Sequence, residues 1–238
     1  MTTSPESSMP ATHQRRKAER PQELLDAALS LFVEKGFAAT RADEVATRAG
    51  VSKGTLYLYY ASKEELLKAV IAQRLSSQIA EGARQVAEHR GSCAELLRNV
   101  LSTWWENVFD SDASGVFKLI ITEVRNFPEI AEFYFREVVE PGQNLIGSVV
   151  QRGIDRGEFR PVPVNSVVQS LVLPMVMLCV HKHSLGACNA CGAPDAMVEP
   201  RLFIRQHIDL LLGGLCVPTS AVPLGASSTN PSSTQVTP

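Results

Sequence analysis

The sequence of 238 residues lacks the features that would place a protein in a membrane or outside the cell. Its longest near-apolar stretch, residues 171–180, has about half the length needed to cross a bilayer. Its first 14 residues contain no apolar run of the kind that secretory signals carry. Its five cysteines are odd in number and irregularly spaced, which argues against a disulfide framework. We therefore expect a cytoplasmic protein with no membrane partner.

The sequence also lacks an excess of positive charge and a catalytic motif. The formal net charge of -2 excludes a uniformly basic nucleic-acid coat. Residues 1–75 are nevertheless mildly basic, with 11 Lys and Arg against 9 Asp and Glu. No glycine-rich phosphate loop, nucleophile elbow or paired acid–base motif stands in a recognisable context. We expect neither an enzyme nor a cofactor.

Apolar residues recur at helical spacing nearly throughout, as Leu24, Ala28, Leu31 and Phe32 illustrate. The pattern predicts an all-α chain of about nine helices, with no repeat of fixed period. The expected helices span residues 21–35, 43–49, 52–60, 62 to beyond 75, 92–109, 115–126, 128–157, 165–183 and 200–212. Pro141 and Pro174 are expected to kink the helices that contain them. The two ends, 1–14 and 217–238, are rich in Ser, Thr and Pro and are expected to be disordered.

Residues 40–67 have the pattern of a helix-turn-helix. This unit needs a short supporting helix, a tight turn and a second helix whose start is open to the major groove. Val45 and Ala46 belong to the inner face of the first helix, Thr40 is its expected cap, and Gly50 makes the turn. An ordinary amphipathic three-helix unit that binds no DNA has the same spacing, so spacing alone leaves both interpretations open.

The side chains of the second helix suit contact with DNA. Leu56 and Tyr60 share the inner face, whereas Lys53, Thr55 and Tyr59 point elsewhere. Lysine can meet phosphate or guanine, threonine a base edge or thymine methyl, and tyrosine a phosphate. Two further candidates, Thr40 and Lys63, stand at helix N-termini, where backbone amides favour phosphate. Glycine at position 54 keeps the start of the helix slim, so that the backbone can approach a duplex.

Residues 17–77, and above all 40–67, resemble the DNA-binding domain of the tetracycline-repressor (TetR/AcrR) family. The resemblance implies a three-helix DNA-binding domain joined by a fourth helix to a helical effector-binding and dimerisation domain, here residues 78–216. It further implies a homodimeric, ligand-responsive transcriptional regulator, usually a repressor. Members often have His-Phe at the place of Tyr59 and Tyr60. The positions that correspond to DNA contacts are Thr40, Arg41, Lys53, Gly54, Thr55, Tyr57, Tyr59 and Lys63.

The C-terminal body is expected to hold the effector and to form the dimer. A cavity between its helices would be mostly apolar, which predicts a small apolar or aromatic effector. Apolar residues of helices 165–183 and 200–212 are expected to pack against a second subunit, and a two-fold dimer requires a palindromic operator. Aromatic residues at helical spacing usually belong to the core, and most of the candidates can be ordinary core. The candidate wall residues are Trp104, Trp105, Phe109, Phe117, Ile121, Phe127, Phe133 and Tyr134.

An alternative function rests on a short thiol and histidine cluster. Cys188 and Cys191 form a Cys-x-x-Cys with His181 and His183 nearby, and these are ligand types that zinc accepts. A vicinal thiol pair is also compatible with a redox switch. Against this, histidines two apart on a helix point to opposite sides, and a lone Cys-x-x-Cys is weak evidence. A variable loop is the preferred interpretation, so no metal is expected.

Overall fold

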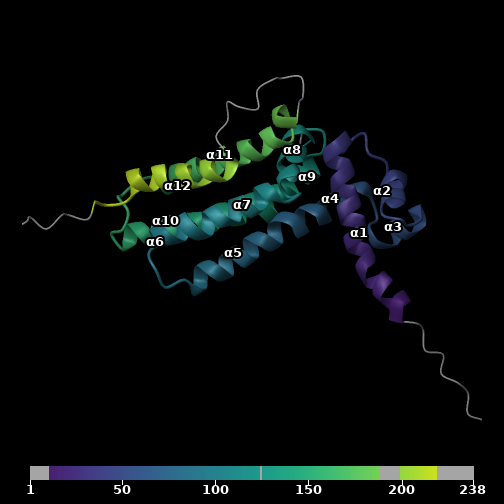
Figure 1. Ribbon diagram of the computed structural model, residues 1–238, viewed down its shortest axis with the longest axis horizontal. Coiled ribbons are helices and arrows are strands. Elements are labelled where there is room, and N and C mark those ends of the chain that lie inside the picture. The colour runs from purple at the N-terminus through teal and green to yellow at the C-terminus, as the bar shows by residue number, and fades with distance from the viewer. Residues whose placement is uncertain (1–10, 124, 188–198, 219–238) are drawn as a thin grey trace, which may run out of the picture.

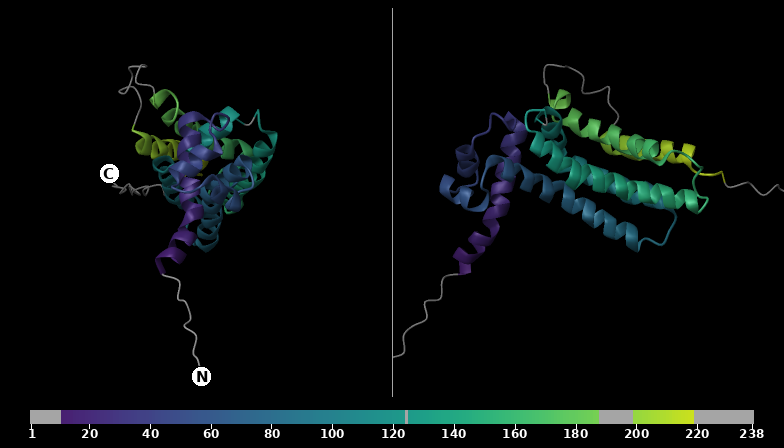
Figure 2. Two further views of the ribbon diagram at one scale, coloured as in Figure 1. Left: turned by 90° about the vertical axis from the view of Figure 1, so that its right-hand side faces the viewer. Right: turned by 180° about the vertical axis from the view of Figure 1, so that it is seen from behind.

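The computed structural model describes residues 11–123, 125–187 and 199–218, with side chains described from residue 19 onward. Within these ranges the chain forms nine helical rods, counting adjoining α and π segments as one rod, and one short 3-10 turn. Strand-like pairing in them is limited to a single bridge between Phe159 and Cys216. The expected all-α fold is thereby confirmed. Three rods form a small domain at one end, and α4 leads from it into an elongated helical body (Figures 1 and 2).

The small domain consists of α1 (Ala11–Lys35), α2 (Ala42–Arg48) and α3 (Lys53–Tyr59), with the start of α4 (Lys63–Ile71) packed against them. Its centre is apolar because the helically spaced residues meet there. Leu24, Phe32 and Leu56 are each fully buried. Burial of a side chain of this size stabilises the fold by about 1.5–3 kcal/mol. Gly36 ends α1 with φ +85°, a left-handed conformation that glycine adopts without strain.

The start of α1 differs from the sequence-based expectation. The helix begins at Ala11 and not at residue 21, so Pro21 lies inside it and not in its first turn. The segment 11–20 carries no apolar stripe, and periodicity therefore gave no signal there. Its Ala, Gln, Arg, Lys and Glu residues are nevertheless strong helix formers. The predicted disordered arm thus overlaps four residues of helix, while residues 1–10 lie outside the described part of the chain.

Three long rods of the body each contain a π-helical segment. Residues Ala72–Ser76 join α4 to α5 (Ser77–Glu88), and Leu96–Leu101 join α6 (Cys93–Glu95) to α7 (Ser102–Asp110). Residues Phe135–Val139 join α9 (Pro128–Tyr134) to α10 (Glu140–Asp155). The last of these ends two residues before Pro141, where a proline kink is expected. A widened turn accommodates a ring that has no N–H to donate.

The remaining rods are α8 (Ser114–Glu123), α11 (Val164–Lys182) and α12 (Pro200–Leu215). By length and composition alone, Val164–Ala187 is apolar enough to cross a membrane. It packs, however, against α8, α10 and α12, and its Leu171 and Met175 are buried. We therefore interpret α11 as a helix of the body that packs against it on one side, while Leu173 and Met177 are exposed.

Candidate DNA-binding face and effector cavity

The helix-turn-helix forms as its pattern predicts. Val45 and Ala46, on the inner face of α2, are buried. Gly50 has φ +66° and turns the chain, and the Val51 amide donates to the Ala46 carbonyl at 2.9 Å. Ser52 then caps α3 by accepting from the Thr55 amide at 3.1 Å. Together, the turn and the cap set the orientation of the start of α3 relative to α2.

The outer surface of α3, which we call the recognition surface, comprises Lys53, Gly54, Thr55, Tyr57 and Leu58. Lys53 is exposed, and its ammonium forms no ion pair within the described ranges. Tyr57 is 44% exposed and Leu58 84%. The Thr55 hydroxyl shares a hydrogen bond of 2.9 Å with Ser52 Oγ. The pattern did not predict Leu58, although its place outside the Leu56–Tyr60 face was a signal for exposure.

Gly54 is not required by the fold. A β-carbon added there would meet only Ser52 Oγ, at 3.8 Å, which is ordinary van der Waals contact. Glycine inside a helix costs about 1 kcal/mol relative to alanine. The interior therefore does not explain this glycine, and the close approach of DNA at Gly54 stays a prediction.

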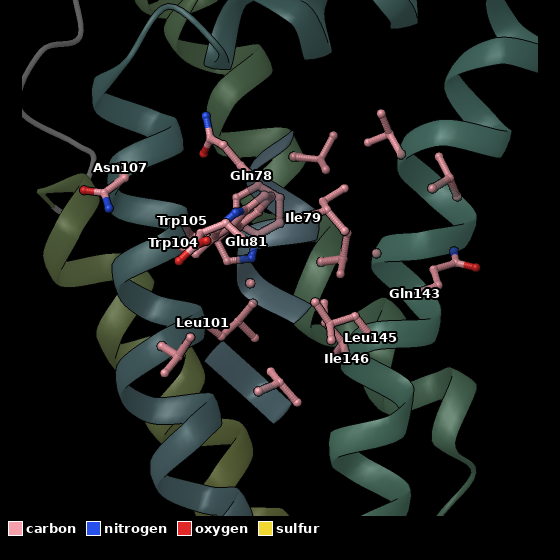
Figure 3. Close-up of a pocket in the computed structure, with 18 of the residues that line it drawn as sticks. Gln78, Ile79, Glu81, Leu101, Trp104, Trp105, Asn107, Gln143, Leu145 and Ile146 are labelled. Carbon is pink, nitrogen blue, oxygen red and sulfur yellow. The ribbon is translucent and has the colours of Figure 1, made fainter. Parts of the chain in front are cut away.

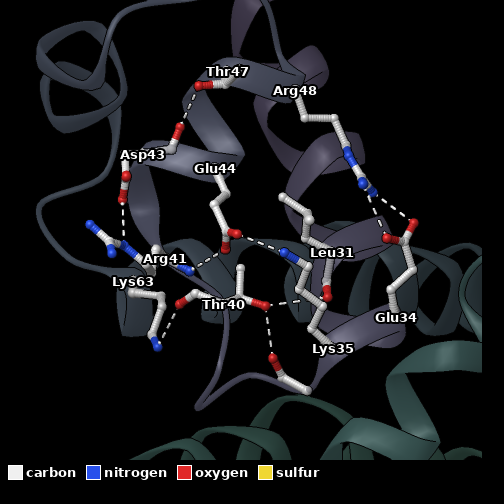
Figure 4. A network of polar contacts seen from close by, with 11 residues as sticks. Leu31, Glu34, Lys35, Thr40, Arg41, Asp43, Glu44, Thr47, Arg48 and Lys63 are labelled. Atoms are coloured by element: carbon white, nitrogen blue, oxygen red, sulfur yellow. Dashed lines mark hydrogen bonds and ion pairs between the residues drawn. The ribbon is translucent and has the colours of Figure 1, made fainter.

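Two of the residues expected to contact phosphate, Thr40 and Lys63, form hydrogen bonds inside the domain (Figure 4). Thr40 is only 2% exposed, and its hydroxyl donates to the carbonyls of Gly36 at 2.7 Å and Leu31 at 3.2 Å. It is also not the cap of α2, because Arg41 occupies that position. The expectation that the Thr40 side chain caps α2 and faces DNA is corrected by this burial.

Lys63 fastens the loop between α1 and α2. Its Nζ donates to the carbonyls of Phe37 at 2.8 Å, Thr40 at 3.0 Å and Ala38 at 3.3 Å, and lies 4.4 Å from the centre of the Phe37 ring. An ammonium has three protons to donate, and all three are used here. In the DNA-free chain Lys63 therefore holds the loop before α2, and its contact with phosphate stays a prediction.

The remaining predicted DNA contacts differ in how exposed their side chains are. Arg41 is exposed, and its Nε lies 3.1 Å from Asp43 Oδ1, a surface pair that leaves the remaining guanidinium donors available. Tyr59 is half-buried against the core. Tyr60, whose hydroxyl needed a partner, donates to the Pro21 carbonyl at 3.5 Å, and burial raises the pKa of this phenol.

Ion pairs brace α2 against α1 (Figure 4). Lys35 Nζ lies 2.6 Å from Glu44 Oε1, and Arg48 Nη1 lies 2.7 Å from Glu34 Oε1. Hydrogen bonds from these cations hold the pKa of both Glu34 and Glu44 below the ordinary value. Exposed pairs contribute little stability, about 0–1 kcal/mol each. Their effect is to orient α2, and with it the start of α3.

The body contains a cavity of about 520 Å³ (Figure 3). Its walls come from α5, α7, α8, α9, α10 and α11 and from the π-helical segments Leu96–Leu101 and Phe135–Val139. Five of the eight predicted wall residues line it, namely Trp104, Trp105, Phe117, Ile121 and Tyr134. The walls from α5 and α10, including Gln78, Glu81, Gln143 and Leu145, were not predicted.

The other three predicted wall residues lie elsewhere. The Phe127 ring packs edge-on against Phe37 with 4.7 Å between ring centres, at the junction of domain and body. Phe109 lies beneath the Lys182 ammonium, 4.7 Å from the centre of its ring. Phe133 faces the Arg136 guanidinium at 5.8 Å. These three side chains are thus packing residues outside the cavity.

Helix α8 contacts both the cavity and the DNA-binding domain. Its Phe117, Ile120 and Ile121 line the cavity. Lys118 Nζ donates to the Val33 carbonyl of α1 at 3.0 Å. Gly115 permits this approach, because a β-carbon there would lie 2.5 Å from Val33 Cγ2. Helix α8 is therefore in contact with both the cavity and α1.

Half of the thiol and histidine cluster lies outside the described residues, namely Cys188 and Cys191. The described histidines do not come together with other ligand types, and no metal-binding group occurs in the described part of the chain. His183 Nε2 is instead 2.8 Å from Ser114 Oγ. Burial raises the pKa of Cys179 to about 12, so this thiol stays protonated and unreactive.

The fold and its two sites define a class: a regulator that reads DNA with a helix-turn-helix and carries an internal cavity for a ligand. Residues 24–70 match the family model "Bacterial regulatory proteins, tetR family". Residues 87–185 match that of the "Tetracyclin repressor-like, C-terminal domain". The chain belongs to the TetR family of transcriptional regulators.

Individual relatives agree with this assignment. The chain is 30% identical over 210 residues to the transcriptional repressor KstR2 of Rhodococcus jostii, covering 88% of this chain and 97% of that one. It is 30% identical over 171 residues to the regulator YfiR of Bacillus subtilis, covering 70% and 80%. FadR from Bacillus subtilis, solved in complex with stearoyl-CoA, shares the fold with a TM-score of 0.63 at 20% identity, covering 81% of this chain and 98% of that one.

Proposed function

We propose that this chain is a homodimeric repressor that binds a palindromic operator and is released from it when an apolar effector fills the cavity. The observation that carries the proposal is the position of α8. One set of its residues lines the cavity, while Lys118 and Glu123 bond to the DNA-binding domain. A ligand changes DNA affinity only if it prefers one of two arrangements, and α8 is the element that both sites contact.

The recognition surface is proposed to enter the major groove. Lys53 and Arg41 are the exposed cations that meet phosphate or guanine, and Tyr57 supplies a hydroxyl. Leu58 is added to the predicted contacts, because an aliphatic side chain suits a thymine methyl. Gly54 admits the DNA backbone. Thr40 serves this surface only indirectly, by fixing the loop before α2, and Lys63 remains a proposed phosphate contact.

The dimer is proposed to form through α11 and α12. Exposed apolar side chains gather on these two helices: Leu173 and Met177 are 61% and 60% exposed, and Leu202 and Leu210 are 47% and 76% exposed. Surfaces of this kind usually mark contacts with another protein chain. A two-fold axis there would present two α3 helices about 34–36 Å apart, one turn of DNA, which is why the operator is expected to be palindromic.

The effector is proposed to be apolar and lipid-sized. The cavity walls are mainly aliphatic and aromatic, and its volume falls within the range of about 300–1,000 Å³ that small-molecule sites occupy. A structural relative binds stearoyl-CoA, which supports an apolar ligand for a body of this shape. A sequence relative is a repressor, which supports the sign of regulation.

Selection of operators from random duplex DNA with the full chain tests this function. Enrichment of a palindrome with half-sites about one turn apart is the expected result. An apolar ligand that binds the body should then lower the affinity for the selected duplex. Enrichment of no palindrome contradicts the DNA-reading function. Tighter DNA binding with ligand contradicts release and indicates an activator or a co-repressor.

A further inference from the structure

The first ten residues of α1 concentrate positive charge. Residues 11–20, which we call the basic segment, contain four Lys and Arg residues against one acidic residue, a net charge of +3. The cations are Arg15, Arg16, Lys17 and Arg20. The segment has no apolar residue larger than alanine, so it lacks the stripe that a helix buries against a core. Arg16 and Arg20 lie one helical turn apart, where two like charges destabilise a helix. Folding therefore does not explain this charge.

The rest of the DNA-binding domain carries no net charge. Residues 21–75 contain seven Lys and Arg and seven Asp and Glu. Five of the seven cations form ion pairs with carboxylates of the domain itself, namely Lys35, Arg41, Arg48, Lys68 and Arg74. Lys63 donates to backbone carbonyls. A duplex presents one negative charge per about 1.7 Å of its axis. The basic segment is thus the main unbalanced positive charge that this domain can offer to DNA.

The basic segment continues α1 beyond the end of α3. The Tyr60 hydroxyl, at the C-terminal cap of α3, donates to the Pro21 carbonyl at 3.5 Å, so the segment ends beside the end of α3. The opposite end of α1 contacts the body, where Lys118 Nζ donates to the Val33 carbonyl. The basic segment therefore lies at the end of α1 remote from the body, and it projects past the other helices of the domain (Figures 1 and 2).

We propose that the basic segment binds the sugar-phosphate backbone of duplex DNA beside the base pairs that α3 reads. The proposal rests on the proposed DNA-reading function and adds a second contact region to the recognition surface. Ten helical residues extend about 15 Å, which matches about four phosphates of one strand at about 3.4 Å each. Phosphate contacts position a protein without reading sequence. The segment consequently strengthens binding to every duplex and leaves the choice of operator to α3.

The test is a variant of the full-length protein that removes three charges, Arg15→Gln/Arg16→Gln/Lys17→Gln. Glutamine is a good helix former, and circular dichroism verifies the fold. The slope of log affinity against log salt should become shallower by ~2–3 units, at about 0.9 per lost contact. Near 0.1 M salt, the affinities for the selected operator and for a random duplex should both fall at least about tenfold. The ratio of the two affinities should stay within about twofold, because phosphate carries no sequence information.

The matched control is Arg136→Gln/Arg156→Gln/Arg160→Gln, which removes the same charge from exposed positions of the body. Its salt slope should stay within ~0.5 unit, since distant charges are screened. Arg15→Lys/Arg16→Lys keeps the charge and should keep the slope. Hydroxyl-radical footprinting adds a positional readout: the unaltered protein should protect sugars beside each half-site that the glutamine variant leaves exposed. If the triple variant does not fold, Arg16→Gln alone should still reduce the slope by ~1 unit.

Equal salt slopes and equal footprints for the glutamine variant and the unaltered protein overturn the proposal. A loss confined to the operator, with random-duplex binding unchanged, also overturns it, because it indicates sequence reading. Unchanged DNA binding with lost binding to phosphatidylglycerol vesicles assigns the segment to a membrane surface instead. A shallower slope on random duplex, combined with enrichment of no palindrome by the unaltered protein, contradicts the operator-reading function and leaves the backbone contact in place.

Discussion

The backbone amide of Phe37 donates to Glu123 Oε1 at 3.2 Å. This bond ties the turn after α1, on which α2 is built, to the last residue of α8. Phe37 is fully buried and also supports Lys63, so displacement of Glu123 would be felt in the loop that positions α2. A single hydrogen bond therefore connects the DNA-binding domain to α8, the helix that forms part of the cavity wall.

Replacing Glu123 with alanine should therefore weaken communication more than DNA binding itself. We expect operator affinity without ligand to stay within about threefold, and the ligand-induced loss of affinity to shrink about fivefold, corresponding to about 1 kcal/mol of coupling. Fluorescence anisotropy of labelled operator, with and without ligand, measures both. Glu132→Ala, an exposed glutamate of α9, is the control. Unchanged coupling in Glu123→Ala would assign the signal to another contact.

Lys53→Ala should make the salt dependence of operator binding shallower. A phosphate contact releases counterions, and losing one reduces the slope of log affinity against log salt by ~1 unit. Titrations at several salt concentrations give the slope. Arg136→Ala removes an exposed cation from the body and should leave the slope unchanged. If both variants show the same salt dependence as the unaltered protein, Lys53 does not contact phosphate.

Gly54→Ala should separate stability from DNA binding. The added methyl group has room and improves helix propensity, so the free energy of unfolding should rise by about 0.5–1 kcal/mol. Operator affinity should fall by about 1–3 kcal/mol, because the methyl group occupies space that DNA needs. Urea denaturation and anisotropy measure the two effects. An unaffected operator affinity would show that DNA does not approach α3 closely at this position.

Leu210→Arg should dissociate the proposed dimer. Leu210 is 76% exposed in the single chain, and a buried unpaired arginine in an interface is strongly unfavourable. Light scattering after gel filtration should show a monomer at micromolar concentration, with operator affinity reduced. Leu58→Arg places the same charge on α3 and should remain dimeric. A dimeric Leu210→Arg would place the interface elsewhere.

His183 should make stability fall as the pH is lowered. Burial, and then the charges of Lys182 and Lys118, hold the pKa of His183 below its ordinary value of 6.5. The unfolded chain consequently takes up a proton near pH 6.5 that the folded chain resists, so stability is full above this pH and declines below it. Urea denaturation at pH 7.5 and 5.5 measures the loss. His183→Gln should reduce the difference between the two pH values, while His207→Gln should preserve it.

The DNA-binding domain was largely predictable from sequence because its signals are local. Gly50, the Ser52 cap and the Leu56–Tyr60 spacing each act within one turn of helix. Thr40 and Lys63 show the limit: residue type suggested phosphate contacts, yet their partners are carbonyls of the folded loop, which no local pattern reveals. Leu58 was missed although its place outside the Leu56–Tyr60 face was a local signal for exposure, because an aliphatic side chain was not considered as a DNA contact.

The cavity was predictable only in part, because helical periodicity breaks at the π-helical segments. Each extra residue in a widened turn rotates the following face by about 100° relative to a regular helix. Trp104 and Trp105 follow the segment Leu96–Leu101, and the walls from α5 and α10 follow the other two. Aromatic residues could be collected as candidates from sequence, but separating Phe127 from Trp105 required knowing how three interrupted helices meet.

Helix α8 both lines the cavity and contacts α1, which has a practical consequence for re-engineering this protein as a biosensor. The helix is only ten residues long. Substitutions in it that broaden ligand specificity therefore also disturb its contacts with α1. Libraries aimed at new ligands are better placed in the walls from α5, α7 and α10, where side chains contact the ligand without holding the output domain. The helix that transmits the response is then kept constant while the input is varied.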